Sequence, residues 1–411
     1  MNILLINHYA GSLYHGMEYR TYYMAREWVR AGHKVLVAAA DQSHVRSKQI
    51  EIPKNKSHLY VKIDGIEYLW LKTTKYSKNG VKRAINIFSF IIQLFRFSKI
   101  ISRCFEPDVV IASSTYPLDI FPARYIAKMT KAKLVYEIHD LWPLSPIQLG
   151  PMSEYHPFIL LVQFAENYCY KYSDAVVSIL PKVAEHVKEH GLAVNKLHIV
   201  ENGICLDEWE NPKEISESLS KTLEEKNNGC FSILYTGQHG IANALTNFVK
   251  AAYILKKEKI VFYLAGKGPE KQKLIELAKK LKLDNLYFLD NVPKSSIASL
   301  FSKVDCLYIG LQKQPLFKYG ISPNKLIDYM MSGKPIIQAI EAGNDMVKDA
   351  GCGISVPAEN PEALAEAIVK MMNMSKSDRE KLGKRGQEYV KKNHDYKNLG
   401  KKFLDAINFK S

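Results

Sequence analysis

The sequence contains no pair of closely spaced cysteines. Its six cysteines stand far apart, with no Cys-x-x-Cys spacing among them: Cys104, Cys169, Cys205, Cys230, Cys306 and Cys352. Scattered cysteines are typical of buried thiols in a reducing compartment, and they argue against a zinc site or a disulfide framework. We therefore expect a protein that uses no metal.

Long uncharged apolar runs and a secretion signal are also lacking. No apolar stretch reaches the roughly 18 uncharged residues that a membrane-spanning helix needs. The first residues, MNILLINHYAGS, contain no basic segment and pass directly into a polar loop, so they predict a first β-strand and not a signal peptide. A cytoplasmic protein is expected.

Acidic residues are absent between Glu67 and Glu106. The same segment contributes eight cations to a chain whose net charge is +15: Lys72, Lys75, Lys78, Lys82, Arg83, Arg96, Lys99 and Arg103. A nucleic-acid interface would draw on several segments with interleaved aromatic residues, so no nucleic-acid partner is expected. One concentrated patch needs a local explanation.

The segment at about 80–103 supplies that explanation in one of two ways. Its sequence, VKRAINIFSFIIQLFRFSKIISR, combines an apolar centre with basic ends. Such a helix lies in the plane of an anionic membrane surface, with its cations on the lipid head groups. The cations that would form this membrane patch are Lys82, Arg83, Arg96, Lys99 and Arg103. A core-packing helix with a basic outer face has the same periodicity and stays open as the alternative.

Chain length and patterning predict two α/β domains. At 411 residues the chain exceeds the roughly 250–300 residues at which single cores stop growing, and 47% hydrophobic with 24% charged residues is a globular composition. Nearly continuous apolar runs alternate with helical patterns, as in parallel sheets covered on both faces. In the first half we expect strands at 2–7, 33–40, 108–114, 133–138, 175–180 and 196–201, with helices at about 17–31, 80–103, 118–130, 157–172 and 181–190.

A polar passage at 211–229 then predicts a linker with an exposed helix, after which the alternation restarts. We expect strands at 231–237, 260–268, 285–291, 306–311, 334–340 and 353–356, with helices at 242–257, 269–282, 295–303, 323–332 and 361–373, and a basic helical tail from about 377. The predicted fold class is α/β, with two tandem Rossmann-like doubly wound domains and a cleft between them.

Two glycine turns follow strands of the second domain. Gly266 and Lys267 lie in GKGP, and Gly237 precedes Asn243 in YTGQHGIANAL. Free backbone N–H groups at such turns can bind an anion, to which a lysine adds charge. A plain strand-to-helix turn with a solvated lysine is the alternative for each.

The stretch YGISPNKLIDYMMSGKPII (319–337) is the most specific in the chain. Ser322 is a suitable N-cap and Pro323 a suitable first helical residue, which places Asn324 and Lys325 in the first turn. A lysine there opposes the helix dipole unless a bound anion offsets the cost. Asp328 lies one turn on and could accept both hydroxyls of a ribose. The alternative is a surface Lys–Asp pair of little energetic value.

The first domain offers two further candidates. EIHDLWPLSP (137–146) ends a strand, so His139 and Asp140 would stand at the carboxyl edge of the sheet, where such sheets bind ligands. A satisfied packing histidine is the alternative. The loop after the first strand carries polar residues that suit a polyhydroxylated ligand or an acceptor, but it lacks the GxGxxG spacing of a dinucleotide site. Its candidates are Gly11, Ser12, Glu18 and Arg20.

These motifs together resemble glycosyltransferase family 4, whose enzymes have the GT-B fold. The matching pieces are GMEYR, AGHKV, EIHDLWP, SDAVVSILP, VENGI, AGKGPEKQKL and PNKLIDYMMSGKPII, and they are most similar to a branch of bacterial surface-polysaccharide enzymes. The resemblance implies a metal-independent transfer, with retained anomeric configuration and no cofactor. It implies a nucleotide-sugar donor, with UDP and an N-acetylhexosamine favoured, and a glycan or polyprenyl-diphosphate-linked acceptor of O-antigen or capsule synthesis. The enzyme would associate peripherally with the inner face of the cell membrane.

The resemblance also assigns roles and domains. Asp328 matches the second acid of the family's Glu-x7-Glu signature and would hold the ribose, whereas the first acid falls on Gly320, which supplies no carboxylate. Asn243 stands where many relatives have a phosphate-binding lysine, a charge that Lys325 or Lys267 would replace. His139 and Lys325 are the expected catalytic residues. The acceptor domain is expected at 1–205, joined by a helix at about 395–411, and the donor domain at 206–394.

Two other functions stay open at this point. A nucleotide-sugar epimerase shares the GT-B fold, and it would turn over UDP-GlcNAc without an acceptor. A non-catalytic membrane or nucleic-acid binder would use the positive patch alone, and the donor motifs count against it.

Overall fold

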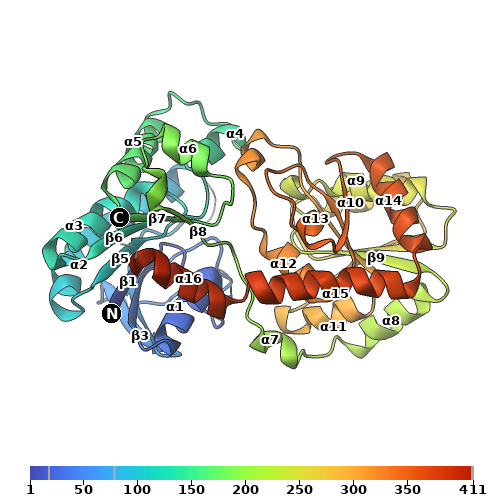
Figure 1. Ribbon diagram of the computed structural model, residues 1–411, viewed down its shortest axis with the longest axis horizontal. Helices are drawn as coiled ribbons and strands as arrows, with labels where there is room; N and C mark the ends of the chain where they lie inside the picture. Colours follow the sequence, from blue (N-terminus) through green and yellow to red (C-terminus); the bar gives the residue numbers. More distant parts are fainter. Residues whose placement is uncertain (17–18, 77–79, 409–411) are drawn as a thin grey trace. The chain divides into compact units, whose positions relative to one another are not determined.

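The computed structural model describes residues 1–16, 19–76 and 80–408, which form two compact units (Figure 1). Unit 1 comprises Met1–Asn202 and Tyr396–Ser411, and unit 2 comprises Gly203–Asp395. The chain therefore leaves unit 1, builds unit 2 completely and returns. The expected domain ranges, 1–205 joined by about 395–411 and 206–394, stay a prediction.

Unit 1 is built on an eight-stranded sheet with the order β3-β4-β2-β1-β5-β6-β7-β8. All neighbours pair in parallel except β3 and β4, which are antiparallel. The strands are β1 (Asn2–Ile6), β2 (Lys34–Ala40), β3 (His58–Ile63), β4 (Ile66–Leu71), β5 (Val109–Ala112), β6 (Lys133–Ile138), β7 (Ala175–Ser178) and β8 (Leu197–Ile199). The sequence interpretation missed the β3–β4 hairpin, because β3 is a largely exposed edge strand that lacks an apolar run. Its turn is Asp64–Gly65, where both residues have positive φ.

The helices of unit 1 cover this sheet, and the last of them comes from the far end of the chain. They are α1 (Tyr19–Arg30), α2 (Val81–Cys104), α3 (Ile120–Thr130), α4 (Leu144–Gln148), α5 (Pro157–Tyr172), α6 (Ala184–Glu189) and α16 (Tyr396–Asn408), with 3-10 turns η1 (Pro117–Asp119) and η2 (Val194–Lys196). Helix α16 packs on α1: Trp28 Nε1 donates to the Gly400 carbonyl at 3.2 Å, and the rings of Trp28 and Phe403 are 5.1 Å apart.

Unit 2 contains a six-stranded, fully parallel sheet with the order β11-β10-β9-β12-β13-β14. The strands are β9 (Phe231–Thr236), β10 (Ile260–Ala265), β11 (Leu286–Leu289), β12 (Cys306–Gly310), β13 (Ile336–Ala339) and β14 (Gly353–Val356). Successive residues of β9 enter opposite cores, since Leu234 packs on one face while Ile233 and Tyr235 pack on the other. Burial on both faces explains why these strands are apolar throughout.

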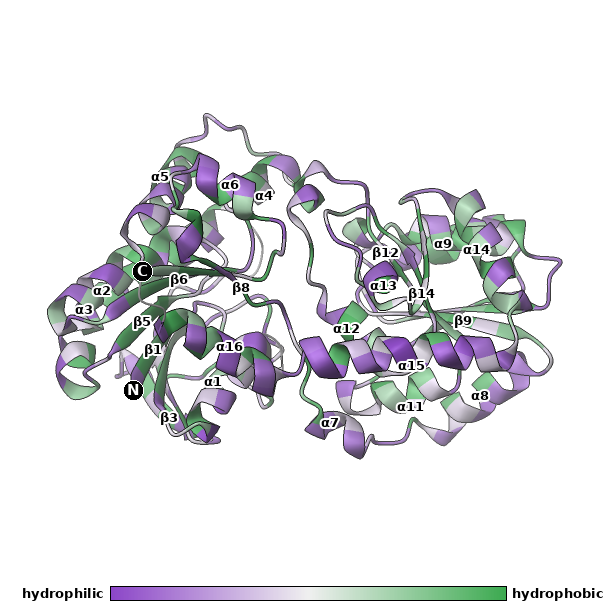
Figure 2. Cartoon of the chain, viewed as in Figure 1, coloured by the Kyte–Doolittle hydropathy of each residue, from purple (hydrophilic) through white to green (hydrophobic). Residues whose placement is uncertain are grey.

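Helices of unit 2 supply the other half of each core. They are α7 (Asp207–Glu210), α8 (Glu217–Asn227), α9 (Leu245–Ile254), α10 (Lys271–Lys280), α11 (Ile297–Ser302), α12 (Asn324–Met331), α13 (Met346–Ala350), α14 (Pro361–Asn373) and α15 (Lys376–Asn393), with 3-10 turns η3 (Ile241–Asn243), η4 (Lys294–Ser296) and η5 (Pro315–Tyr319). Figure 2 shows apolar strands inside each unit and a strongly polar α15. The predicted fold class, two Rossmann-like α/β sheets, is confirmed.

Candidate functional site

Two glycine turns at the carboxyl ends of neighbouring strands β9 and β10 form the floor of the site in unit 2. The Gly237 amide donates to the Ala265 carbonyl at 3.0 Å, and the His239 amide donates to the Lys267 carbonyl at 2.8 Å. A Cβ on Gly266 would lie 2.0 Å from the Gly237 carbonyl oxygen. The turns are thus pressed together backbone to backbone, and only glycine fits at 266.

Lys325 lies over the first of these turns. Its Nζ donates to Tyr235 Oη at 2.6 Å and to Asn243 Oδ1 at 3.3 Å, and it sits 4.0 Å from the centroid of the Tyr235 ring. A Cβ on Gly237 would lie 2.8 Å from Lys325 Cε. The structure thus brings together Gly237, Asn243 and Lys325, which the sequence analysis selected separately.

The electrostatics of Lys325 favour an anion. None of the ion pairs formed by the described residues involves this lysine, and both of its hydrogen-bond partners are neutral. Burial lowers the pKa of Lys325 to about 7, because a charged ammonium group loses hydration there. An anion on the turn would restore the favourable environment of the charge.

Helix α12 carries this lysine, and its start differs from the expected one by a residue. Pro323, with φ −77° and ψ 122°, is the N-cap, and the helix begins at Asn324, so Ser322 is not the N-cap. The extended ψ of Pro323 keeps it out of the helix although its φ fits. Ser322 is buried, and Asn324 is exposed in the first turn.

Asp328 is one turn further along α12. It is half-buried, and it forms no ion pair with Lys325 among the described residues. Burial, with a smaller contribution from Glu208, raises the pKa of Asp328 to about 6, and Lys294 opposes that rise. The Lys325 ammonium bonds to Tyr235 and Asn243 instead. The alternative of a surface Lys–Asp pair therefore does not describe these residues.

Gly320 ends the 3-10 turn η5 with a φ of 88°, which favours glycine. The segment after it is held by Asn344, whose Oδ1 accepts from the Ile321 amide at 2.8 Å and whose Nδ2 donates to the Ile321 carbonyl at 3.0 Å. The first acid of the family's Glu-x7-Glu signature would stand at position 320, and this chain has a turn of the backbone there without a carboxylate.

Three neighbouring side chains of this site were missed by the sequence analysis. Lys271, not the exposed Lys267, reaches the second glycine turn and donates to the carbonyls of Gly266 and Leu289 at 2.9 and 3.1 Å. His239 is fully buried beside the turn, and burial together with Lys271 lowers its pKa to about 4. Tyr235 presents its hydroxyl to Lys325. The GQHG motif was the available signal for His239, whereas the contact of Lys271 depends on the folded turn.

In unit 1, His139 belongs to a buried polar cluster at the end of β6. Its Nε2 lies 2.9 Å from Ser113 Oγ and 3.1 Å from Glu137 Oε2, and Ser113 Oγ donates to Glu137 Oε2 at 2.6 Å. Burial alone would raise the pKa of Glu137, but the charge of Arg20 lowers it well below its usual range, with help from His139 and Ser113. Neighbouring Asp140 instead accepts a hydrogen bond from the Leu141 amide at its Oδ1, at 2.9 Å, and burial raises the pKa of Asp140.

Arg20 is the anchor of this cluster. Its Nε and Nη2 donate to Glu137 Oε1 at 2.9 and 2.8 Å, while Nη1 and Nη2 donate to the carbonyls of Glu201 and Val200 at 2.6 and 2.8 Å. The side chain is 3% exposed, so its guanidinium group fixes protein structure. Its expected part in acceptor binding stays a prediction, with those of Gly11 and Ser12.

Gly11 and Ser12 lie together in the loop after β1 and are both buried. The Gly11 carbonyl accepts from Tyr68 Oη at 2.9 Å, and Ser12 Oγ lies 2.9 Å from His15 Nδ1. The fourth candidate of this loop, Glu18, lies outside the described residues, as does Lys78 of the basic segment.

Helix α2 displays most of the expected basic patch. Lys82, Arg96, Lys99 and Arg103 are exposed, whereas Arg83 turns inward and donates from Nε to Tyr9 Oη at 3.2 Å. By length and composition α2 could cross a membrane, yet one side of it is buried in unit 1 through residues such as Ile87, Phe90 and Leu94. The core-packing interpretation is therefore correct for that side, and the outer side stays available to an external surface.

Comparison with known families matches both parts of the chain. Residues 14–208 match the family described as Glycosyltransferase Family 4, and residues 224–389 match the family described as Glycosyl transferases group 1. Among curated proteins, the chain is 24% identical over 392 residues to the putative colanic acid biosynthesis glycosyl transferase WcaI of Escherichia coli strain K12, covering 93% of each chain.

Solved structures share the fold over the full chain. Sucrose-phosphate synthase from Thermosynechococcus elongatus superposes with a TM-score of 0.73 at 14% identity, covering 99% of this chain and 98% of that one. HepE from Anabaena, solved in complex with UDP and glucose, superposes with a TM-score of 0.67 at 14% identity, covering 99% of each chain. The architecture common to these structures is the GT-B fold.

Proposed function

Because this chain belongs to glycosyltransferase family 4 and has the GT-B fold, we propose that it transfers an N-acetylhexosamine-type sugar from a UDP-sugar to a lipid-linked or oligosaccharide acceptor of surface-polysaccharide synthesis. The transfer is proposed to retain the anomeric configuration and to need no metal. Its donor site is the glycine-turn site of unit 2, formed by the turns at Gly237 and Gly266 with Lys325.

The observation that carries this proposal is the position of Lys325 over the Gly237 turn. A half-buried lysine with only neutral hydrogen-bond partners is suited to bind a diphosphate through its charge. Asp328, in the same helix, is assigned to the ribose hydroxyls.

The residues of the proposed donor site would stabilise the departing diphosphate. The bond from the anomeric carbon to the diphosphate breaks, the acceptor hydroxyl oxygen bonds to that carbon, and the hydroxyl proton passes to an oxygen of the departing diphosphate. Negative charge grows on the diphosphate as the bond breaks, so a preorganised ammonium group and helix start lower the barrier. His139, held by Glu137 and Ser113, is proposed to contact the donor sugar or its phosphate.

Substitution of Lys325 and Asp328 tests the donor site. Lys325→Ala and Asp328→Asn should each weaken UDP binding by at least about tenfold, since a charge-assisted hydrogen bond contributes about 1.5–3 kcal/mol. Isothermal titration with UDP measures the effect, and the exposed Lys267→Ala should bind nearly as the parent chain does. If both variants bind UDP and transfer sugar at the parent's level, the donor site is misplaced. Turnover of UDP-GlcNAc without an acceptor would instead identify an epimerase.

We further propose that the enzyme docks on the anionic inner face of the cell membrane through the outer side of α2. Apolar side chains recur there at helical spacing, with exposed fractions of 77% for Val81, 50% for Ile85, 57% for Ile92 and 42% for Phe95. Four exposed cations flank them: Lys82, Arg96, Lys99 and Arg103. Apolar area with flanking cations is the composition that binds an anionic bilayer surface.

Vesicle flotation tests this docking. Replacing the four cations with Gln should abolish binding to vesicles that contain anionic lipid, because each contributes about 1 kcal/mol near the surface. The matched control removes the same charge from unit 2, at Lys256, Lys257, Lys279 and Lys280. If the two variants float equally, the outer side of α2 is an ordinary solvated surface and the proposed docking is wrong.

A further inference from the structure

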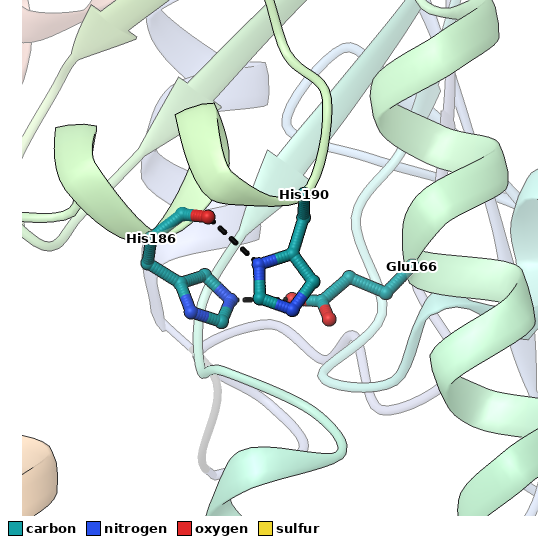
Figure 3. Close-up of side chains that lie close together, drawn as sticks. All are labelled: Glu166, His186 and His190. Carbon is teal, nitrogen blue, oxygen red and sulfur yellow. Dashed lines mark hydrogen bonds and ion pairs between the residues drawn. The ribbon is translucent and has the colours of Figure 1, made fainter.

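A cluster of two histidines and a glutamate lies in unit 1, apart from the residues assigned to the donor. Glu166 belongs to α5, His186 belongs to α6, and His190 directly follows the end of α6 (Figure 3). Their ligand atoms all lie within 4.8 Å of one another. Glu166 and His186 are buried, at 1% and 4% exposure, and His190 is half-buried.

The carboxylate of Glu166 is held in place before any ion arrives. Tyr170 Oη donates to its Oε1 at 2.9 Å, and Gln163 Nε2 donates to its Oε2 at 2.8 Å. Each carboxylate oxygen has two lone pairs, so these bonds leave acceptor capacity for a cation. Partners of this kind orient a metal ligand and are a regular part of metal sites.

The backbone fixes the tautomer of His190. Its Nδ1 lies 2.8 Å from the His186 carbonyl, which can only accept, so Nδ1 carries the proton. The neutral ring therefore presents a lone pair at Nε2, and Figure 3 shows this side of the ring turned toward Glu166. Among the hydrogen bonds of the described residues, none uses His190 Nε2.

A simple histidine–glutamate hydrogen bond explains only half of this arrangement. The 2.9 Å contact of His186 Nε2 with Glu166 Oε1 is satisfied without an ion. It does not involve the second imidazole, which the His186 carbonyl holds with its ring centre 4.2 Å from that of His186 and with a ring nitrogen within 4.8 Å of the same carboxylate. A divalent cation can use both rings: it accepts the lone pair of His190, and at His186 it replaces the proton that lies between Nε2 and Glu166 Oε1, which is released to solvent.

We propose that Glu166, His186 and His190 bind one divalent cation, with Zn²⁺ the preferred ion, and thereby join α5 to α6. Two imidazoles four residues apart and a carboxylate form a ligand set that zinc uses, in which water commonly supplies the fourth ligand. Ligands about 2.0–2.2 Å from zinc are about 3.3 Å apart, so the widest separation here contracts by roughly 1.5 Å. The site does not rest on the proposed transferase chemistry.

Cobalt titration of the full, untagged chain after treatment with a chelator tests this site. The parent chain should bind one equivalent of Co²⁺, seen as a visible absorption band, and Zn²⁺ should displace it and raise the melting temperature of the protein. The test variant is His190→Gln, which keeps an amide donor for the His186 carbonyl but lacks the imidazole ligand. Its affinity should fall at least about tenfold, the loss typical even for a partner that merely orients a ligand.

The matched control is His58→Gln, a half-buried histidine on the edge strand β3. It should bind and be stabilised as the parent chain is. If Co²⁺ affinity is the same in His190→Gln and the parent, or if the parent shows neither the band nor the stabilisation, the proposal is wrong. Glu166→Gln, with circular dichroism to verify folding, provides a second variant with the same expected loss.

Discussion

At the scale of single residues, Lys325 is a lysine whose hydrogen-bond partners in the protein are neutral, so that an anionic ligand would be its first opposite charge. Its ammonium group is surrounded by Tyr235 and Asn243, and its pKa of about 7 lies below the ordinary 10.5. In the folded protein it releases a proton above pH 7, while in the unfolded chain it keeps that proton up to about pH 10.5. Since the unfolded state binds more protons in this window, stability due to Lys325 rises with pH from about 7 to 10.5.

Binding of UDP should return to Lys325 the proton that it releases in the free protein above pH 7. An anion on the Gly237 turn raises the pKa of Lys325, so at pH 8 we expect uptake of about 0.9 proton for each UDP bound. Titration calorimetry in buffers of different ionisation enthalpy measures this uptake. Lys325→Met should bind UDP weakly and take up no proton. Equal uptake by the parent and this variant would assign the proton to another group.

Glu137 illustrates the opposite case, a charge whose partner is already present. Glu137→Gln leaves the buried Arg20 guanidinium unpaired and should destabilise unit 1 by about 3–5 kcal/mol at pH 7, measured by urea unfolding. The folded-state pKa of Glu137 is lowered, so its contribution is present above the ordinary carboxyl pKa of about 4.5 and is lost as the pH falls further. The difference between variant and parent should therefore shrink below pH 4.5. The exposed Glu185→Gln should change stability by less than about 0.5 kcal/mol.

Sequence reasoning identified most of the polar residues at the Gly237 turn but not their partners. Gly237, Asn243 and Lys325 stood out because each follows a strand or begins a helix. His239 and Lys271 did not, because their position depends on how two turns from different parts of the chain pack together. Arg20 was assigned to a ligand-binding loop, and only the fold reveals that it bonds to Glu137.

At the scale of elements, the paired glycine turns determine what can be changed without loss of the fold. Gly266→Ala would place a Cβ 2.0 Å from the Gly237 carbonyl oxygen, a backbone atom that cannot rotate away. We expect unit 2 to lose about 2–4 kcal/mol of stability and UDP binding to fall with it, as measured by urea unfolding and titration calorimetry.

The neighbouring Gly240 provides a matched control for that prediction. Its φ is −103°, and an added Cβ would lie 3.6 Å from Asn243 Nδ2, an ordinary contact. Gly240→Ala should therefore change stability by less than about 0.5 kcal/mol. A similar loss in both alanine variants would contradict the close approach at Gly266 as the cause, because the lower entropy of the unfolded chain after a glycine-to-alanine change stabilises the folded state and cannot produce a loss.

Elements were predictable where burial imposes a pattern. The strands of both parallel sheets appear as apolar runs because helices cover both faces, and all six strands of unit 2 were anticipated. The β3–β4 hairpin was missed because its outer strand is exposed and hence free of that constraint. Helix α12 starts one residue later than expected, because Pro323 has a φ that fits a helix but an extended ψ that does not.

At the scale of the whole molecule, the net charge of +15 divides into local uses. Lys325 and Lys271 face the glycine turns of unit 2, while the exposed cations of α2 lie on the outer side of unit 1. The two-domain α/β architecture was predictable from chain length and alternation. Which cations act on which surface required the fold, as Arg83, turned inward onto Tyr9, demonstrates.

The return of the chain to unit 1 predicts a division of stability between the units. Phe403 is fully buried against Trp28, so Phe403→Ala should cost unit 1 about 3–5 kcal/mol. The loss should appear as a lower melting temperature by tryptophan fluorescence, since three of the four tryptophans, Trp28, Trp70 and Trp142, belong to unit 1. Stabilisation by UDP should change little, because Lys325, Asp328 and the glycine turns lie in unit 2, and His139 is the one residue of unit 1 proposed to contact the donor. The exposed Lys401→Ala is the control on the same helix. Loss of UDP binding in Phe403→Ala would contradict this independence.

The same helix imposes an order on biosynthesis. Chains usually fold from their first-made domain onward as the ribosome releases about 5–20 residues each second. Here unit 2, Gly203–Asp395, is complete before the residues of α16 that cover Trp28 have been made. The first half of the polypeptide must therefore wait, with an uncovered aromatic patch on α1, until α16 has been made. While unit 2 is being synthesised, this aromatic surface is exposed in the way that makes incompletely folded chains prone to aggregate.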